Sequence, residues 1–120
     1  MKVAISTSGN TLDSPLDGRF GRAPRFLVYD VETESFELVD NTQNLNAAQG
    51  AGIQAAQTVA GTDAEALITG HCGPKAFRVL GEAEIAVYLT DVATVREALD
   101  KLLAGELVAT GGADVEGHWV

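Results

Sequence analysis

The chain has 120 residues, of which 46% are hydrophobic and 21% charged, a balance typical of one folded domain. Its net charge of -9 argues against general nucleic-acid binding, because such proteins neutralise phosphates with a broad basic surface. A single cysteine excludes an internal disulfide and the usual four-ligand thiolate site for zinc or an iron-sulfur cluster. We therefore expect one domain over residues 1–120, cytoplasmic and monomeric, without nucleic-acid or membrane partners.

Strands are predicted in the first third of the chain. Residues 2–6 form a short apolar run suited to a buried strand, and 25–31 and 35–39 flank a turn with the sequence E-T-E. The latter two runs should pair as an antiparallel hairpin. The connection at 7–24 is long and rich in Ser, Gly, Asp and Pro, and such loops in compact domains are more often functional than idle.

Helices alternate with strands in the remainder. The expected elements are a helix at 51–60, a strand at 65–69, a helix at 74–80, a strand at 84–89 and a helix at 92–104. Asp91 is expected to cap the last helix and Gly105 to end it, with Val95, Leu99, Leu102 and Leu103 as its buried stripe. This order predicts an α/β fold with a mixed five-stranded sheet. Its strand-to-helix loops should meet at one edge, where ligands usually bind.

The cationic residues of the chain are separated from its acids. Residues 18–29 and 66–81 contain five of the eight Lys and Arg residues and neither Asp nor Glu. Residues 41–62 carry no charged side chain, although the chain has 17 acids. A locally positive pocket can coexist with a negative net charge, so this pattern predicts a binding site for an anion.

Helix starts supply further groups for an anion, because they present free N–H groups and the positive end of the helix dipole. Glycines at 50, 52, 70 and 73 lie near two such starts and let a ligand approach the backbone, although glycine also serves ordinary turns. The nearby Phe20 and Phe26 could wall off a pocket or belong to the core.

Cys72 is a candidate for direct chemistry. It lies at an expected helix start, beside His71 and one turn before Lys75, so we expect a lowered pKa for its thiol. A thiolate there could be a soft metal ligand or a nucleophile, whereas a small buried cysteine would only pack under the turn. His71 could equally be a metal ligand or a hydrogen-bonded loop residue.

Four sequence motifs, taken together, resemble those of the dinitrogenase iron-molybdenum cofactor biosynthesis family. They are G-R-F-G-R-A-P-R-F at 18–26, G-A-G at 50–52, T-G-H-C-G-P-K-A-F at 69–77 and A-L-D-K-L-L-A-G-E-L at 98–107. The resemblance covers nearly the whole chain in order. It implies a ribonuclease H-like, three-layer α/β fold, in agreement with the predicted order of elements.

The resemblance also implies a ligand. Members of the family bind or carry metal-sulfur clusters, so the expected cargo is an anionic molybdenum-copper sulfide cluster or a related molybdenum/iron-sulfur cluster. A preassembled anionic cluster needs cations and N–H donors around its sulfides rather than four cysteines. The site residues carried over from the motifs are Arg19, Arg22, Arg25, Gly50, Gly52, His71, Cys72, Gly73 and Lys75, with Cys72 and His71 as possible metal ligands.

Three other functions deserve comparison with a non-enzymatic cluster carrier. A nuclease needs converging carboxylates, and the acid-poor windows offer none. A cysteine-dependent enzyme or redox protein would use Cys72 with His71, but sequence neighbours in an extended turn usually point apart. A phosphate or nucleotide sensor would use the same cations and helix starts, but the chain lacks a G-x-x-x-x-G-K-[ST] loop and should not hydrolyse nucleotides itself. The family resemblance implies a partner ATPase that would power any delivery of the cluster.

Overall fold

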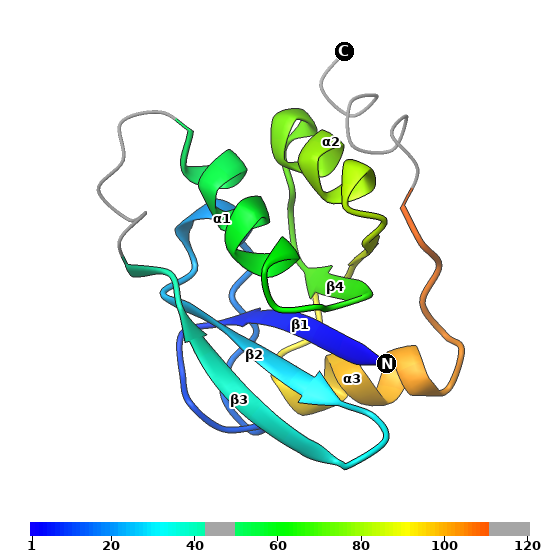
Figure 1. Cartoon of the computed structure of the whole chain (residues 1–120). Coiled ribbons are helices and arrows are strands. Elements are labelled where there is room, and N and C mark those ends of the chain that lie inside the picture. The colour runs from blue at the N-terminus through cyan, green and yellow to red at the C-terminus, as the bar shows by residue number, and fades with distance from the viewer. Residues whose placement is uncertain (43–49, 111–120) are drawn as a thin grey trace.

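A mixed five-stranded sheet with the strand order β3-β2-β1-β4-β5 forms the centre of the protein (Figure 1). The computed structural model describes residues 1–42 and 50–110. Its strands are β1 (Lys2–Thr7), β2 (Arg25–Asp30), β3 (Ser35–Asp40), β4 (Ala66–Thr69) and β5 (Ala86–Leu89). Strand β2 pairs antiparallel with β1 and β3, whereas β4 pairs parallel with β1 and β5. The predicted hairpin and mixed sheet are therefore confirmed.

Helices cover both faces of the sheet, α1 and α2 on one side and α3 on the other (Figure 1). Their bounds are Ala51–Ala60 for α1, Pro74–Glu82 for α2 and Val95–Leu103 for α3, and a short 3-10 helix, η1, spans Phe20–Arg22. Alternate residues of β1 serve the two cores: Ala4 packs beneath α1 and α2, whereas Val3 and Ile5 pack against α3. Burial on both faces explains the continuous apolar run of β1. Within residues 1–42 and 50–110, no helix is long and apolar enough to cross a membrane.

Helix α3 begins later than the sequence predicts. Thr94, not Asp91, caps it: the Thr94 hydroxyl accepts a hydrogen bond from the Glu97 N–H at 3.2 Å, and the two side chains also meet at 3.3 Å. The Thr-x-x-Glu sequence at 94–97 is that of a capping box, although the Glu97 carboxylate here accepts from the Thr94 hydroxyl. The predicted stripe is also too long, because Leu103 is 49% exposed, whereas the stop at Gly105, with φ 76°, is confirmed.

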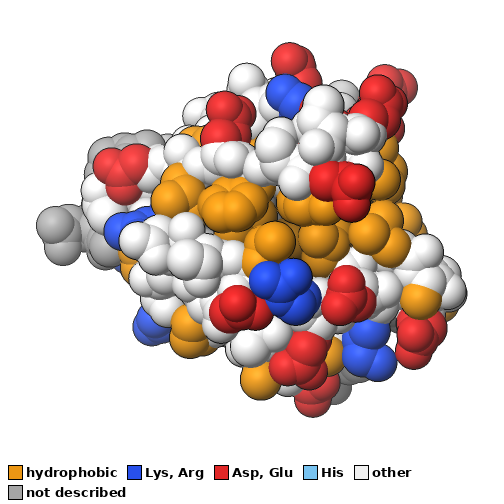
Figure 2. Space-filling view, turned by 90° about the horizontal axis from the view of Figure 1, so that it is seen from below, with side chains coloured by type: hydrophobic (Ala, Val, Ile, Leu, Met, Phe, Trp, Pro, Cys, Tyr) orange, Lys and Arg blue, Asp and Glu red, His pale blue; other side chains and the backbone are white. Residues whose placement is uncertain are grey.

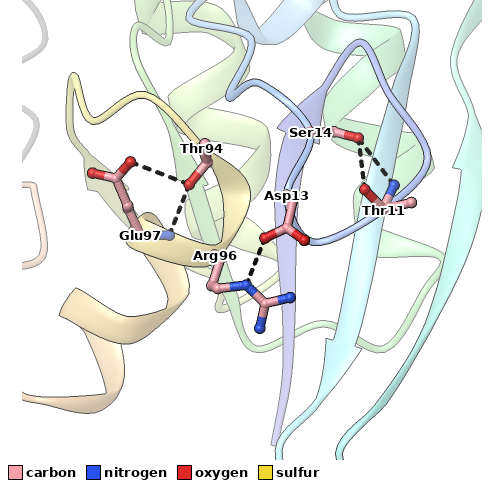
Figure 3. Close-up of polar contacts among 6 residues, drawn as sticks. All are labelled: Thr11, Asp13, Ser14, Thr94, Arg96 and Glu97. Atoms are coloured by element: carbon pink, nitrogen blue, oxygen red, sulfur yellow. Dashed lines mark hydrogen bonds and ion pairs between the residues drawn. The ribbon is translucent and has the colours of Figure 1, made fainter.

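The long loop after β1 supplies the remaining partners of the α3 N-terminus (Figure 3). The N–H groups of Val95 and Arg96 donate to the carbonyls of Ser14 at 3.0 Å and Leu12 at 2.7 Å. The Arg96 Nε lies 2.7 Å from the Asp13 carboxylate, and this hydrogen bond and ion pair lower the pKa of Asp13. The start of α3 is thus fully occupied by the protein itself.

Buried polar side chains at the strand ends hold the same loop across the edge of the sheet. The fully buried polar residues are Ser6, Thr7, Asn41 and Thr69. The Ser6 hydroxyl donates to the Asp17 carbonyl at 2.6 Å, and Asn41 Nδ2 donates to the Ala23 carbonyl at 2.8 Å. These hydrogen bonds satisfy backbone carbonyls that would otherwise be buried unpaired, and they fix both ends of the segment that contains η1.

Two close contacts between glycines bring the segment that contains η1 directly against β4 and α1. A Cβ atom at Gly70 would lie 2.6 Å from the Gly18 Cα, and one at Gly21 would lie 3.0 Å from the Gly52 backbone nitrogen. Neither position has room for a side chain. The chain around η1 therefore lies directly on the residue after β4 and on the first turn of α1.

We predict that Gly70→Ala separates η1 from the end of β4 and lowers the free energy of unfolding by about 1 to 3 kcal/mol, as overpacking does elsewhere. The measurement is urea unfolding followed by circular dichroism. Gly81→Ala is the matched control, because a Cβ atom there meets nothing within 4 Å and alanine favours the helix. Equal stability of both variants would show that the Gly18 contact does not constrain the loop.

Candidate anion-binding site

A cavity of about 710 Å³ opens between η1 and the starts of α1 and α2, beyond the carboxyl end of β4. Its lining residues are Arg19, Phe20, Gly21, Arg22, Gly50, Gly52, Ile53, His71, Gly73, Pro74, Lys75 and Ala76. Among the residues that the structure describes, this lining contains two arginines, a lysine and a histidine, and neither Asp nor Glu. The cavity is thus a locally cationic hollow in an acidic protein.

The fold brings most of the predicted site residues to this cavity. Those that line it are Arg19, Arg22, Gly50, Gly52, His71, Gly73 and Lys75. They come from three segments far apart in sequence, which meet because the loop after β1 folds over the same sheet edge as the helix starts. Their role in binding a ligand stays a prediction. Arg25 and Cys72 do not line the cavity.

Both helices that face the cavity begin without a side-chain cap. Gly50 is the N-cap of α1, with φ 76°, and Gly73 is the N-cap of α2; neither helix has an acid in its first turn. The first N–H groups of a helix have no carbonyl partner within it. Since Gly52, Ile53, Lys75 and Ala76 line the cavity, two positive helix ends converge on it, in contrast to the occupied start of α3.

Arg19 lies at the rim of the cavity, where Asp17 and the backbone of His71 hold it. The Arg19 N–H donates to the Asp17 carboxylate, whose side chain is 9% exposed, at 2.9 Å, and the Arg19 Nε lies 3.5 Å from the same oxygen. Arg19 also forms a β-bridge with His71, in which the Phe20 N–H donates to the His71 carbonyl at 3.2 Å. The Arg19 side chain is still 74% exposed, so its charge lies at the mouth of the cavity rather than in the core.

Apolar side chains form another part of the lining. Phe20 is 2% exposed and packs against Phe26, with ring centroids 5.3 Å apart. The sequence left open whether Phe20 walls off a pocket or belongs to the core. It does both, because it is a core residue that also lines the cavity. The lining also contains Gly21, Ile53 and Ala76, which the sequence motifs did not predict as site residues. Of these, Gly21 lies within G-R-F-G-R, between two predicted site arginines, and that position could have indicated it.

Arg25 lies outside the cavity lining. It opens β2, as the strand predicted at 25–31 requires, and its Nη1 donates to the Gly9 carbonyl at 3.3 Å. It is also paired in register with Asp40, whose pKa is lowered mainly by hydrogen bonds from Thr42 and to a smaller extent by the Arg25 charge. Arg25 thus braces the start of the long loop from outside the cavity.

Cys72 contradicts the prediction of a lowered thiol pKa. The residue is 1% exposed and belongs to the core beneath α1 and α2. Burial raises the pKa of its thiol from 9.0 to about 12, because a thiolate would lose its hydration there. The Sγ atom lies 3.7 Å from the Gly73 carbonyl. The sequence places Cys72 beside a helix start, but it does not show whether the thiol faces the cavity or the core.

A conventional metal site is not found in the described part of the chain. Among residues 1–42 and 50–110, no group of three or more His, Cys, Asp or Glu side chains is placed to hold a metal ion. The predicted ligands Cys72 and His71 are adjacent in sequence, but the first is buried and the second lines the cavity. What the cavity offers instead is positive charge and N–H donors, which suit an anion that already carries its own ligands.

The model of the family described as "Dinitrogenase iron-molybdenum cofactor" matches residues 1–105. The chain belongs to this family. Among solved structures, it is similar to the apo form of the orange protein from Desulfovibrio gigas, with 41% identity, a TM-score of 0.90, and 92% and 93% of the two chains covered. The resemblance to this family that the sequence motifs indicate, including a likeness to the orange protein of sulfate-reducing bacteria, is confirmed.

Two further relatives support the family assignment. A putative NifB protein from Thermotoga is 36% identical, with a TM-score of 0.79 and 90% and 91% of the two chains covered. An uncharacterized protein of Methanocaldococcus jannaschii is 31% identical over 110 residues, which are 89% of each chain. Family membership indicates a role in the binding or biosynthesis of a metal cofactor.

We predict that the buried Cys72 thiol reacts slowly with alkylating agents and that its ionisation lowers the free energy of unfolding only at alkaline pH. Below pH 9 both folded and unfolded chains keep the Cys72 proton; between pH 9 and 12 the unfolded chain loses it first, so stability falls. The expected slope is up to about 1.4 kcal/mol per pH unit, measured as the difference in urea unfolding between wild type and Cys72→Ala. Alkylation by iodoacetamide at pH 8 should be about a hundredfold slower in the native protein than in urea. Rapid alkylation of the native protein would contradict the burial of the thiol.

Proposed function

We propose that this protein binds and carries an anionic metal-sulfur cluster as a non-enzymatic carrier, foremost a molybdenum-copper sulfide cluster. The observation that carries the proposal is the acid-free cavity, in which cations from the loop and two uncapped helix starts converge. A carrier of a related molybdenum/iron-sulfur cofactor precursor would use the same features. Family membership and the likeness to the orange protein support a metal-sulfur cluster as the cargo in either form.

The charges supply binding energy of a suitable size. A pair of unit charges at about 4 Å gains about 1 kcal/mol in water and about 4 at an effective dielectric of about 20. Each helix start adds roughly 0.3 to 1 kcal/mol toward an anion. Because Arg19 and Lys75 are exposed, their individual contributions should lie near the lower limit. Several such contacts around one multiply charged cluster still give substantial affinity without a metal–protein bond.

The position of Cys72 favours this carrier over a cysteine-dependent enzyme. A nucleophile must reach its substrate as a thiolate, whereas this thiol is buried and its pKa is raised to about 12. Direct ligation of metal by Cys72 would likewise require the turn at 72–73 to rearrange. His71 lies in the cavity lining and can contribute a hydrogen bond or positive charge to the cluster.

The proposal also covers the fold type, the location, the oligomeric state and the energy source for delivery. The fold is of the ribonuclease H-like type, the protein acts in the cytoplasm as a monomer, and a partner ATPase provides the energy for delivery. A carrier needs no catalytic residue, so the proposal assigns none.

We predict that the purified protein takes up molybdenum and copper stoichiometrically when tetrathiomolybdate and copper are added. Lys75→Ala should raise the Kd about fivefold, which corresponds to the loss of about 1 kcal/mol. The measurements are visible absorption and metal analysis after gel filtration. Raising the salt concentration should weaken binding, because the contacts at the rim are exposed to screening.

Arg78→Ala is the matched control for Lys75→Ala. It removes the same charge from the same helix, but Arg78 does not line the cavity. Equal loss of affinity in both variants would indicate a general charge effect instead of a site. Cys72→Ser should retain binding; its failure to bind, in a variant that melts like the wild type, would favour direct thiolate ligation. Absence of any uptake would reject the molybdenum-copper cargo.

A further inference from the structure

The outer edge of the β2–β3 hairpin is exposed and regular. In the described part of the chain, β3 pairs with β2 alone and lies at one end of the sheet. Its six residues pair one to one with β2, without a bulge or proline. Phe36 and Leu38 are 40% and 42% exposed on this strand. An edge with these properties is open to pairing with another strand.

The exposed side chains form an apolar surface on the side of the sheet that carries α3. Pairing in register sets Phe36 beside Tyr29 and Leu38 beside Leu27, and Leu27 and Tyr29 belong to the core beneath α3. Figure 2 shows this side of the molecule, with apolar side chains gathered across its middle and both acidic and basic side chains around them. Helix α3 covers β1 but leaves the outer strand open.

The hairpin is also strongly acidic. Residues 30–40 contain five acids and neither Lys nor Arg: Asp30, Glu32, Glu34, Glu37 and Asp40. Hydrogen bonds from Glu32 and Thr42 lower the pKa values of Asp30 and Asp40, respectively, so both remain ionised near neutral pH. The few neighbouring cations are Lys2, Arg25 and the N-terminal amine, which lies 3.4 Å from Glu32.

This charge decides what kind of strand can pair with β3. A second copy would bring another acidic hairpin beside this one, and any register that sets Glu37 opposite Glu37 or Asp40 would be destabilised by like charges. The chain also has a net charge of -9. Positively charged side chains on the incoming strand would remove this penalty, while apolar ones would cover Phe36 and Leu38.

We propose that the outer edge of β3 and its apolar face form a docking site for an extended, basic segment of a partner protein. In that segment, apolar residues alternate with Lys or Arg, so that one face covers Phe36 and Leu38 while the cations reach Glu37 and its neighbours. The backbone of β3 supplies hydrogen bonds, as in other complexes formed by strand addition. The inference does not depend on the cluster-carrier proposal, because the cavity lies on the face covered by α1 and α2.

The test uses a short synthetic peptide that alternates Lys with Val, titrated into the full-length 15N-labelled protein. Binding should shift the amide signals of residues 35–40 and leave the signals of the cavity residues unchanged. The double variant Phe36→Thr/Leu38→Thr should raise the Kd about tenfold, because it removes apolar contact while threonine keeps the strand. Glu37→Lys should raise it about fivefold.

Two controls separate this site from a general attraction between opposite charges. Leu103→Thr changes another exposed apolar residue, 49% exposed at the end of α3, and Glu82→Lys makes the same charge change on α2. Both should bind the peptide like the wild type. Equal weakening by these controls, or absence of shifts in β3, would overturn the proposal. Self-association in ultracentrifugation, abolished by the Phe36→Thr/Leu38→Thr variant, would show that a second copy occupies the edge.

Discussion

The contact of two glycine pairs is the constraint on which the cavity depends. Gly18 meets Gly70, and Gly21 meets Gly52, at distances that exclude a side chain. These contacts, together with the bridge between Arg19 and His71, place η1 directly over the starts of α1 and α2. Buried hydrogen bonds from the strand ends maintain the same arrangement. Without close backbone packing, the arginines of the loop would not share a cavity with the helix starts.

The same arrangement explains how an acidic protein can offer a site to an anion. Among the helices that the structure describes, α3 differs from α1 and α2 at its start. A capping side chain and carbonyls of the loop after β1 satisfy its first N–H groups. The starts of α1 and α2 have neither side-chain caps nor acids in their first turns. Their positive ends and the cations beside η1 therefore act on one volume, and the nearest acid described, Asp17, pairs with Arg19 without lining the cavity.

The two faces of the sheet differ in chemistry. The face beneath α1 and α2 contains the buried Cys72 and leads to the cationic cavity. The face beneath α3 continues into an acidic hairpin with exposed apolar residues. A carrier that binds a cluster on one side and a basic partner on the other could keep both bound, because neither surface covers the other.

The sequence by itself determined the elements, the mixed sheet and the grouping of cations, because apolar periodicity, turn residues and missing acids are local properties. It wrongly predicted a lowered pKa for the Cys72 thiol and Asp91 as the cap of α3, and it did not show that Arg25 lies outside the cavity. Each of these depends on which neighbours surround a residue. Core atoms desolvate Cys72, the Gly9 carbonyl accepts from Arg25, and the Thr94 side chain caps α3. Only the tertiary structure decided which predicted site residues share a cavity, since that meeting depends on close contacts between glycines distant in sequence.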